Sequence, residues 1–477
     1  MAEDVISVDH TPLCVDLDGT LVQADTLFEG TLAFLKAKPW ALARLLKWGS
    51  QSRALYKERV SQAHPVEPAH LPYNPRVLEF MAAQKEAGRP LILVTGSDQS
   101  TARLVADHLG VFDQIMASDG KYNLSGANKR RALEERFGAG GFDYLGNSSA
   151  DLAVWRGCRR AYMVRPEPGV ERRARAEGLA CQVLDPGPQE PWRTALKAMR
   201  PWQWAKNVLL AMPIVLAHQV GDAAAWLGVL TAMLAFCLCS SAVYLANDLW
   251  DLPSDRRHPR KRRRALAAGD MPLIMALALI PALMAVGLAL GGLVSSQVFW
   301  LLALYLLLTS AYSIKIKELA LLDILVLAGL YTLRILAGGP AAGVAISFWL
   351  LIFSTFFFLS LAFVKRFTEL KALEGNDPAG RGYRQSDQGF LVPAGLASGY
   401  LAVLVVALYL NSPKVTALYH HAVWLWLVCP LLVYWISRIW LRAHRGEMHD
   451  DPVLFAIRDP ASYVVGGLAL LILILAV

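Results

Sequence analysis

The feature that most restricts the fold of this chain is a series of long apolar runs that extends from about residue 205 to residue 477. Most of the runs approach the roughly 20 residues that an α-helix needs to cross the hydrocarbon core of a bilayer. Only 18% of the 477 residues are charged, so a single soluble core and a disordered chain are both excluded. We therefore expect nine membrane segments, at residues 205–219, 223–246, 271–291, 295–313, 319–337, 344–364, 389–411, 420–440 and 461–477.

The basic residues indicate how these segments are oriented. The loops after the even-numbered segments hold most of them: Arg256, Arg257, Arg260, Lys261, Arg262, Arg263, Arg264, Lys315, Lys317, Lys365, Arg366, Lys371, Arg381, Arg384, Arg442 and Arg445. The opposite loops carry almost only Lys414. By the positive-inside rule, we expect a multi-pass protein of the plasma (inner) membrane, with the N-terminal domain and the polar loops on the cytoplasmic side. The net charge of +8 then reflects these loops, and no nucleic-acid partner is expected, whereas a homo-oligomer is compatible with the sequence.

An α/β domain is expected before the membrane segments. Apolar strand-like runs at residues 13–17, 91–94 and 161–164 alternate with helical stretches such as residues 74–87. This alternation favours a parallel sheet with helices on its faces. Three prolines and a glycine at residues 185–191 indicate a linker. The expected domains are residues 1–185, with a helical cap at about 26–75, a linker at 186–195 and a membrane domain at 196–477.

Two carboxylates follow the first predicted strand, in Val15-Asp16-Leu17-Asp18-Gly19-Thr20. Residues two apart at the end of a strand point the same way, so Asp16 can attack a phosphorus atom while Asp18 protonates the leaving oxygen. Gly19 allows the backbone to turn sharply away from the strand. The pattern predicts a phosphate-ester site at this end of the sheet.

Four motifs over residues 11–165 together resemble the haloacid dehalogenase (HAD) superfamily. After Asp16 and Asp18, they are Thr95 at the end of a strand, Lys129 in Gly-Ala-Asn-Lys, and the stretch from Tyr144 to Asp151. The resemblance implies an α/β HAD-like (Rossmannoid) fold, phosphate binding by Thr95, and a role for Lys129 in offsetting the anionic transition state. It also implies that Mg2+ is held by Asp16, Asp18, Asn147 and Asp151. Asn147 departs from the pattern, because many members have Asp there, so a domain that only binds is an alternative.

A helical cap insertion separates the first two motifs, and residues 27–60 within it combine apolar and basic character. One interpretation is a packed cap core. The other is a segment that lies on the membrane surface and presents a lipid-linked substrate to Asp16.

The second membrane segment ends in Asn247-Asp248-Leu-Trp-Asp251-Leu-Pro-Ser-Asp255. Its three aspartates fall at i, i+3 and i+7 on one helix face, although Pro253 must break or kink the turn. Carboxylates clustered at a membrane interface are costly unless they bind cations, and Mg2+ held in this way can grip a diphosphate. The basic run that follows can neutralise further phosphate oxygens.

This spacing resembles the UbiA prenyltransferase superfamily over about residues 195–477, which implies an all-α transmembrane bundle of nine helices. The loop after the sixth segment, which begins Lys365-Arg366, is basic, and this suits a substrate that is itself phosphorylated. With the stretches at residues 200–207, 312–315, 323–338 and 449–455, the chain resembles the decaprenyl-phosphate phosphoribosyltransferase branch, which makes a lipid-linked ribose for the cell wall. By that resemblance, Asp248, Asp251 and Asp255 hold Mg2+ and the diphosphate of phosphoribosyl diphosphate (PRPP), and the substrate is held by Asn247, Arg264, Lys206, Lys365, Arg366 and Arg381. Arg334 is expected to snorkel or to pair with Asp323, whereas the resemblance implies a functional role for it.

The sequence thus predicts a membrane transferase that moves phosphoribose from PRPP onto a polyprenyl (decaprenyl) phosphate, with Mg2+ in both domains. The HAD-like domain would then remove the 5-phosphate of the product. Three alternatives stay open: an aromatic prenyltransferase of quinone biosynthesis, a HAD-like domain that is regulatory or acts on another phosphomonoester, and a transporter. The transporter ranks lowest, because the polar clusters lie at the cytosolic ends of the segments rather than at the midplane.

Overall fold

The computed structural model describes residues 10–188, 190–373, 381–412, 420–448 and 451–476, so Lys414 and residues 449 and 450 lie outside the described part. The chain forms two compact units. The first consists of Met1–Ala198 together with Asp248–Leu277, and the second of Met199–Asn247 together with Ala278–Val477. Each is described by itself.

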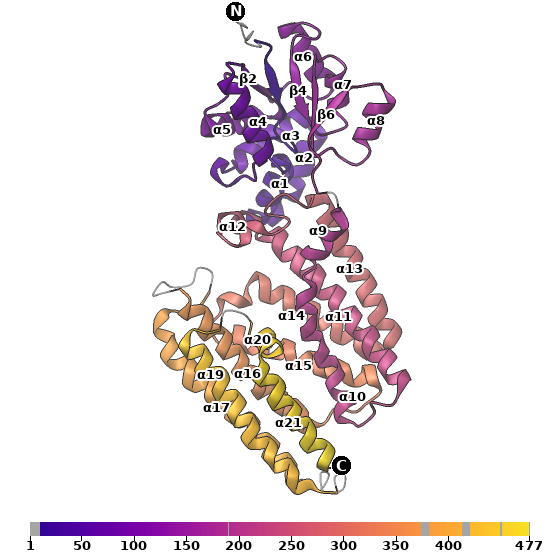
Figure 1. Cartoon of the computed structure of the whole chain (residues 1–477), viewed down its shortest axis with the longest axis vertical. Coiled ribbons are helices and arrows are strands. Elements are labelled where there is room, and N and C mark those ends of the chain that lie inside the picture. Colours follow the sequence, from indigo (N-terminus) through magenta and orange to yellow (C-terminus); the bar gives the residue numbers. More distant parts are fainter. Residues whose placement is uncertain (1–9, 189, 374–380, 413–419, 449–450, 477) are drawn as a thin grey trace, which may run out of the picture. The chain divides into compact units, whose positions relative to one another are not determined.

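The first unit contains one parallel sheet of six strands in the order β3-β2-β1-β4-β5-β6 (Figure 1). The strands are β1 (Leu13–Val15), β2 (Leu91–Asp98), β3 (Gln114–Ser118), β4 (Asp143–Gly146), β5 (Ala161–Val164) and β6 (Cys181–Asp185). The predicted parallel sheet is therefore confirmed, and β2 runs four residues beyond the predicted strand at residues 91–94.

The central strand β1 is buried on both faces, and this accounts for its run of consecutive apolar residues in the sequence. Leu13 and Val15 pack into one hydrophobic cluster and Cys14 into another, and all three side chains are fully buried. Alternate residues of a strand point to opposite faces, so a sheet covered on both faces needs apolar residues at every position.

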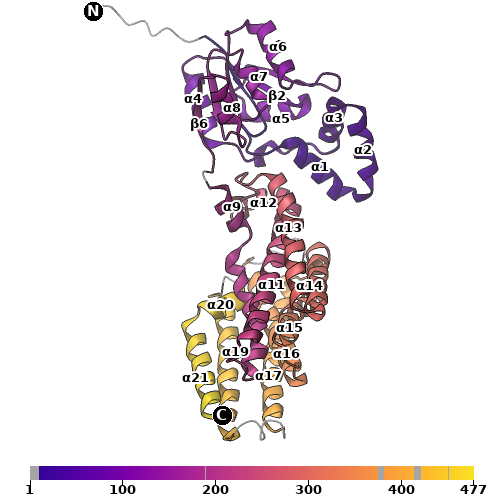
Figure 2. The same ribbon diagram turned by 90° about the vertical axis from the view of Figure 1, so that its right-hand side faces the viewer.

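Helices cover the sheet and form the cap (Figures 1 and 2). They are α1 (Thr26–Ala37), η1 (Pro39–Ala41), α2 (Leu42–Gln51), α3 (Arg53–Ala63), η2 (Pro68–His70), α4 (Pro75–Glu86), α5 (Gln99–Leu109), α6 (Ala127–Phe137), α7 (Asp151–Trp155) and α8 (Val170–Ala176). A further helix, α9 (Pro191–Ala198), follows the last strand. The elements from α1 to η2 occupy the predicted cap. Asn74 caps α4 by accepting a hydrogen bond from the N–H of Arg76 at 3.0 Å.

The strand order places a functional edge between β1 and β4. From β1 the chain moves to β2 and β3 on one side, and it later crosses to β4, β5 and β6 on the other side. Ligands of open α/β sheets bind at such a switch point, outside the carboxyl ends of the strands. Asp16 directly follows β1 and Asn147 directly follows β4.

The second unit and the segment joined to it are helical. Seven helices in the described part are long and apolar enough to cross a membrane: Ala223–Trp250, Leu273–Val294, Ser296–Ile314, Leu322–Ala342, Phe348–Lys371, Gln385–Leu410 and Ala422–Arg445. Nine were expected. The first expected segment folds instead as η3 (Pro201–Ala211) and the short α10 (Met212–Leu216), and the last is the shorter helix α21 (Pro460–Ala476).

These spans include α11 (Ala223–Trp250), α13 (Leu273–Val294), α14 (Ser296–Ile314), α15 (Leu322–Ala342), α16 (Phe348–Lys371), η6 (Gln385–Asp387) with α17 (Gln388–Leu410), and η7 (Ala422–Leu427) with α19 (Val428–Arg445). The shorter connecting elements are α12 (Leu252–Arg257), η4 (Lys261–Arg263), η5 (Ile316–Glu318) and α20 (Pro452–Arg458). The predicted break at Pro253 is present, because α11 ends at Trp250 and α12 begins at Leu252 with this proline in its first turn.

Candidate active sites

The site of the N-terminal unit is built around Asp16. Lys129 from α6 places its Nζ 3.0 Å from Asp16 Oδ1 and 3.7 Å from Asp151 Oδ1. Lys129 also donates a hydrogen bond at 2.7 Å to the hydroxyl of Tyr144, which in turn donates to Asp151 Oδ1 at 2.7 Å. All four side chains are buried. The structure thus brings together three residues from separate predicted motifs.

Asp18 is held by the start of the cap and by β2. The N–H of Thr26, the first residue of α1, donates to Asp18 Oδ1 at 2.9 Å, and the hydroxyl of Ser97 donates to Oδ2. Thr95 is fully buried and accepts a hydrogen bond from the N–H of Ser97 at 3.0 Å. Ser97 was not among the predicted site residues, although alternation along a strand puts it on the same side of β2 as Thr95.

Burial dominates the electrostatics of the two carboxyls. It raises the pKa of Asp16 to about 7, against the opposing effect of the Lys129 ammonium. It also raises the pKa of Asp18 to about 6; the carboxylate of Asp25 adds to this rise, and the hydrogen bond from Ser97 opposes it. Near neutral pH this pair therefore retains a proton far more readily than exposed aspartates do.

Asn147 joins the loop after β4 to the loop after β1. Gly19 has φ +74°, and a Cβ there would lie 2.1 Å from Asn147 Nδ2. The hydroxyl of Thr20 donates to Asn147 Oδ1 at 3.3 Å, and the N–H of Asn147 donates to Asp151 Oδ2 at 3.1 Å. The close approach of Asn147 thus requires glycine at position 19.

Gly19→Ala is therefore expected to lower the stability of the domain and to displace Asn147 from the loop after β1. The left-handed backbone alone costs an L-residue about 1–2 kcal/mol, and the clash with Asn147 adds to this cost. Gly110→Ala is the matched control, because Gly110 has φ +64° but open space around it. In thermal unfolding, Gly19→Ala should lower the melting temperature clearly more than Gly110→Ala does. Equal decreases in melting temperature would argue against the close approach of Asn147 to Gly19.

The residues at this edge fit Mg2+ on chemical grounds. Within the described residues, no three Asp, Glu, His or Cys side chains are grouped closely enough to form a metal site by themselves. The carboxylates of Asp16, Asp18 and Asp151 and the amide oxygen of Asn147 are hard oxygen donors. Most of these oxygens accept a hydrogen bond from a neighbouring group, and each has a second lone pair for a cation. Mg2+ keeps several of its waters in proteins, so a small set of such donors suits it.

The predicted diphosphate motif lies in the segment Asp248–Leu277 of the same unit. Arg264 Nη1 lies 2.9 Å from Asp248 Oδ1 and 2.6 Å from Asp255 Oδ2, so the arginine joins the two aspartates. Asp251 is half-buried between α11 and α12, and Asn247 is half-buried in α11.

One carboxylate oxygen beside Arg264 is placed where it could bind a cation. Asp255 Oδ1 is buried and accepts no hydrogen bond, and the nearest ammonium, Lys261 Nζ, lies 3.9 Å away. Burial also raises the pKa of Asp255, an effect that Arg264 opposes. A buried carboxylate oxygen without a partner is costly, and a bound Mg2+ would satisfy it.

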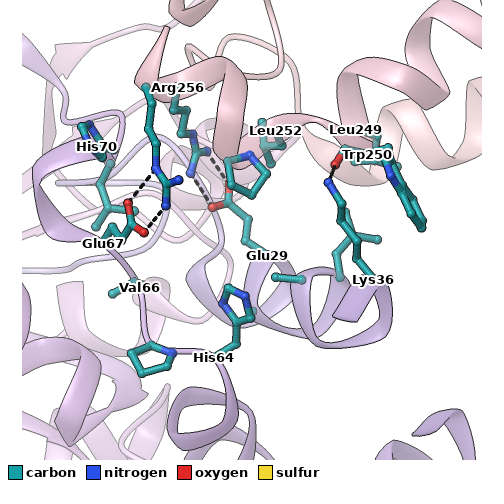
Figure 3. Close-up of a pocket in the computed structure, with 17 residues that line it drawn as sticks. Glu29, Lys36, His64, Val66, Glu67, His70, Leu249, Trp250, Leu252 and Arg256 are labelled. Carbon is teal, nitrogen blue, oxygen red and sulfur yellow. Dashed lines mark hydrogen bonds and ion pairs between the residues drawn. The ribbon is translucent and has the colours of Figure 1, made fainter. Parts of the chain in front are cut away.

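The segment that contains Asp248, Asp251 and Asp255 forms ion pairs with the cap (Figure 3). Arg256, the residue after Asp255, forms an ion pair with Glu29 of α1, and their side chains are only 8% and 12% exposed. Arg257 pairs with Glu67, and this second pair is exposed. The two segments border a cavity of about 110 Å³. Because Thr26 at the start of α1 holds Asp18, one helix contacts both predicted sites of this unit.

A basic cluster in the second unit surrounds Asp451. Lys206 Nζ and Lys365 Nζ lie 2.9 and 3.2 Å from Asp451 Oδ2, and the hydroxyl of Tyr331 donates to Oδ1 at 3.1 Å. Burial alone would raise the pKa of Asp451, but the two ammonium groups hold it well below its usual range. Two cations thus face one carboxylate, which leaves positive charge for a phosphate. Asp451 lies in the stretch 449–455 that contributes to the family resemblance, but no sequence pattern gives this residue a role.

Arg366 and Arg381 form a different network. Arg366 is 1% exposed and donates to Asp323, Glu369 and the hydroxyl of Tyr312. Arg381 lies 3.4 Å from the same hydroxyl and 3.8 Å from Glu369. The structure therefore brings the two predicted phosphate-binding arginines together around Glu369 and Tyr312, and Arg366 ties α16 to α15.

The expected pairing of Arg334 with Asp323 is wrong. Arg334 instead donates to Asn207 Oδ1 at 2.9 Å and to the hydroxyl of Tyr305 at 3.0 Å. Asp323 instead forms an ion pair with Arg366 and accepts a hydrogen bond from the hydroxyl of Tyr383. Arg334 is buried, so it does not snorkel either.

Arg366→Met is expected to destabilise the helical unit by about 3–5 kcal/mol, because it leaves the buried carboxylate of Asp323 without its cation. Arg381→Met, at a side chain that is 26% exposed, should cost under about 1 kcal/mol. Thermal unfolding in detergent measures both. Adding Asp323→Asn to Arg366→Met should recover part of the loss, and a double variant no more stable than Arg366→Met alone would contradict a specific pair.

The sequence matches two family models. Residues 208–458 match the model described as the UbiA prenyltransferase family. Residues 13–156 match the model described as haloacid dehalogenase-like hydrolase.

Individual relatives show similarity over one or both parts. The chain is 39% identical over 462 residues to "Uncharacterized protein y4nM" of Sinorhizobium fredii (strain NBRC 101917 / NGR234), which covers 96% of this chain and 89% of that protein. It is 37% identical over 185 residues to decaprenyl-phosphate phosphoribosyltransferase of Mycolicibacterium smegmatis, over 38% of this chain and 58% of that enzyme. A solved UbiA homolog from Archaeoglobus fulgidus, bound to GPP and Mg2+, has a TM-score of 0.45 and 15% identity over 58% of this chain and 99% of that chain.

Proposed function

The chain belongs to the UbiA prenyltransferase family and carries an N-terminal haloacid dehalogenase-like hydrolase domain, and from this premise we propose that it performs two consecutive reactions on one lipid. The first moves phosphoribose from PRPP to a polyprenyl phosphate and releases diphosphate. The second removes the 5-phosphate of that product and leaves prenylphosphoryl ribose. The seven long apolar helices and the family make it an integral membrane protein, and the basic loops support a cytoplasmic position for both reactions.

The observation that carries the first reaction is the cluster of Lys206 and Lys365 around Asp451. Two cations facing one carboxylate suit a substrate that is itself phosphorylated. The relative named decaprenyl-phosphate phosphoribosyltransferase supports the same choice of substrates.

In the transfer, an oxygen of the polyprenyl phosphate forms a bond to C1 of the ribose. The bond from C1 to the diphosphate oxygen breaks, and the diphosphate leaves with its electron pair. Asp248, Asp251 and Asp255 would hold Mg2+, which would supply charge stabilisation for the leaving diphosphate. Arg264 orients Asp248 and Asp255. In the helical unit, Lys206 and Lys365 would bind oxygens of a phosphorylated substrate.

In the hydrolysis, Asp16 attacks the phosphorus of the 5-phosphate while the bond from phosphorus to the ribose oxygen breaks. Asp18 gives its proton to that oxygen, and Lys129 offsets the negative charge that develops on the phosphoryl group. Water then releases inorganic phosphate from Asp16 and returns the proton to Asp18. Asp16, Asp18, Asn147 and Asp151 would hold the Mg2+ of this site.

Incubation of detergent-purified protein with Mg2+, labelled PRPP and a polyprenyl phosphate tests the proposal. Label should enter lipid, in products with and without the 5-phosphate. If no label enters lipid while a prenyl diphosphate and an aromatic acid react instead, the chain is an aromatic prenyltransferase and the proposal is wrong.

A further inference from the structure

Helix α2 and the turn before it present large apolar side chains to the outside of the cap. Trp40, Leu42 and Leu46 are 80%, 53% and 67% exposed. The neighbouring side of α2 is already covered, because Leu45 is buried and Trp48 packs on Phe34 with ring centroids 5.5 Å apart. Single exposed apolar residues are common on proteins, but three within seven residues form an apolar face.

The charges around this face are all of one sign. Between Glu29 and Glu58 the sequence contains no acidic residue and six basic ones: Lys36, Lys38, Arg44, Lys47, Arg53 and Lys57. Lys38, Arg44 and Lys47 are exposed and adjoin the apolar side chains. A helix with exposed large apolar residues flanked by Lys and Arg is typical of segments that lie in the interface of an anionic membrane.

The start of this face is tied to the end of a membrane helix. Lys36 Nζ donates a hydrogen bond at 2.6 Å to the carbonyl oxygen of Trp250, which is the last residue of α11 (Figure 3). The ion pair of Glu29 with Arg256 holds α1 against the residues that follow. Trp40 is four residues beyond Lys36, so even extended backbone keeps it within about 14 Å of that point.

We propose that Trp40, Leu42 and Leu46 insert into the headgroup region of the bilayer that α11 spans. Lys38, Arg44 and Lys47 then lie against the phosphates of anionic lipids. The surface fixes the hydrolase domain at the membrane, and it does so whether or not the two reactions proposed above are correct.

The test uses the full chain in nanodiscs that contain a lipid with a photoreactive acyl chain, followed by mass spectrometry of the crosslinked peptides. With anionic lipid present, the peptide covering residues 38–48 should be crosslinked. The double variant Arg44→Glu/Lys47→Glu should reduce this crosslinking at least fivefold, because each basic residue near an anionic surface contributes on the order of a fivefold factor in affinity. In purely zwitterionic nanodiscs the same variant should have little effect.

Leu46→Glu should also remove the crosslinks at residues 38–48. The matched control is Leu104→Glu on α5, where Leu104 is 39% exposed, and it should leave these crosslinks unchanged. Both positions are exposed, so both variants should keep the thermal stability of the parent protein. Absence of crosslinks at residues 38–48 while membrane helices of the same sample are labelled would overturn the proposal. Equal loss in Leu104→Glu would overturn it too.

Discussion

Asp16→Asn is expected to stop removal of the 5-phosphate and to leave transfer intact, so that the 5-phosphorylated lipid accumulates. An amide cannot attack phosphorus, and Lys129, 3.0 Å from Asp16, then has no nucleophile to orient. Removal of a nucleophile lowers turnover by at least about 10³-fold. The measurement is the ratio of the two labelled lipids formed from PRPP and a polyprenyl phosphate.

Asp113→Asn serves as the matched control, because Asp113 lies in the same unit, is partly exposed and pairs with Lys85. It should leave the ratio unchanged. If Asp16→Asn dephosphorylates the lipid at the parental rate, the hydrolase domain does not act on this product. Unchanged transfer and unchanged hydrolysis together would make the domain a docking or regulatory module.

Asp255→Asn is expected to lower transfer by about 10²–10³-fold, the usual loss when one preorganised electrostatic group is removed from a site. The variant keeps the shape of the side chain, while the buried Oδ1, which has no hydrogen-bond partner, loses its charge. Transfer should also require at least tenfold more Mg2+, because metal affinity falls when a ligand weakens. Label incorporated into lipid over a Mg2+ titration measures both effects.

Asp270→Asn is the control within the same segment, because Asp270 is 44% exposed and pairs with Arg165. It should transfer phosphoribose at the parental rate. Hydrolysis of a water-soluble phosphomonoester should be unchanged in both variants. Parental transfer by Asp255→Asn at low Mg2+ would contradict the assigned role of this carboxylate.

The N-terminal domain was predictable because its site residues follow strands. Asp16 and Asp18 come directly after an apolar run, and a parallel sheet brings the carboxyl ends of its strands to one edge. Lys129 and Asp151 could be assigned from motif order before any contact was known. Ser97 was missed because a hydroxyl inside a strand has no sequence signal beyond its spacing from Thr95.

The helical unit was less predictable, for two physical reasons. Its polar contacts join residues far apart in sequence, such as Lys206 with Asp451, and no periodic pattern marks such a pair. Charges inside the bundle also compete for partners, so Asp323 binds Arg366 and not Arg334. Two of the nine expected spans are not confirmed. At the first, Pro201 and Pro213 accompany short elements where a full helix was expected, and the last is α21, a helix of 17 residues.

The segment Asp248–Leu277 belongs by its contacts to the N-terminal unit, although the sequence places it between two membrane helices. A gene cut once at the linker would therefore yield two defective products. The first half would keep Glu29 but lose Arg256, and the second would carry an exposed arginine beside Asp255. A functional protein divided at the linker should therefore require compensating substitutions at Glu29 or Arg256.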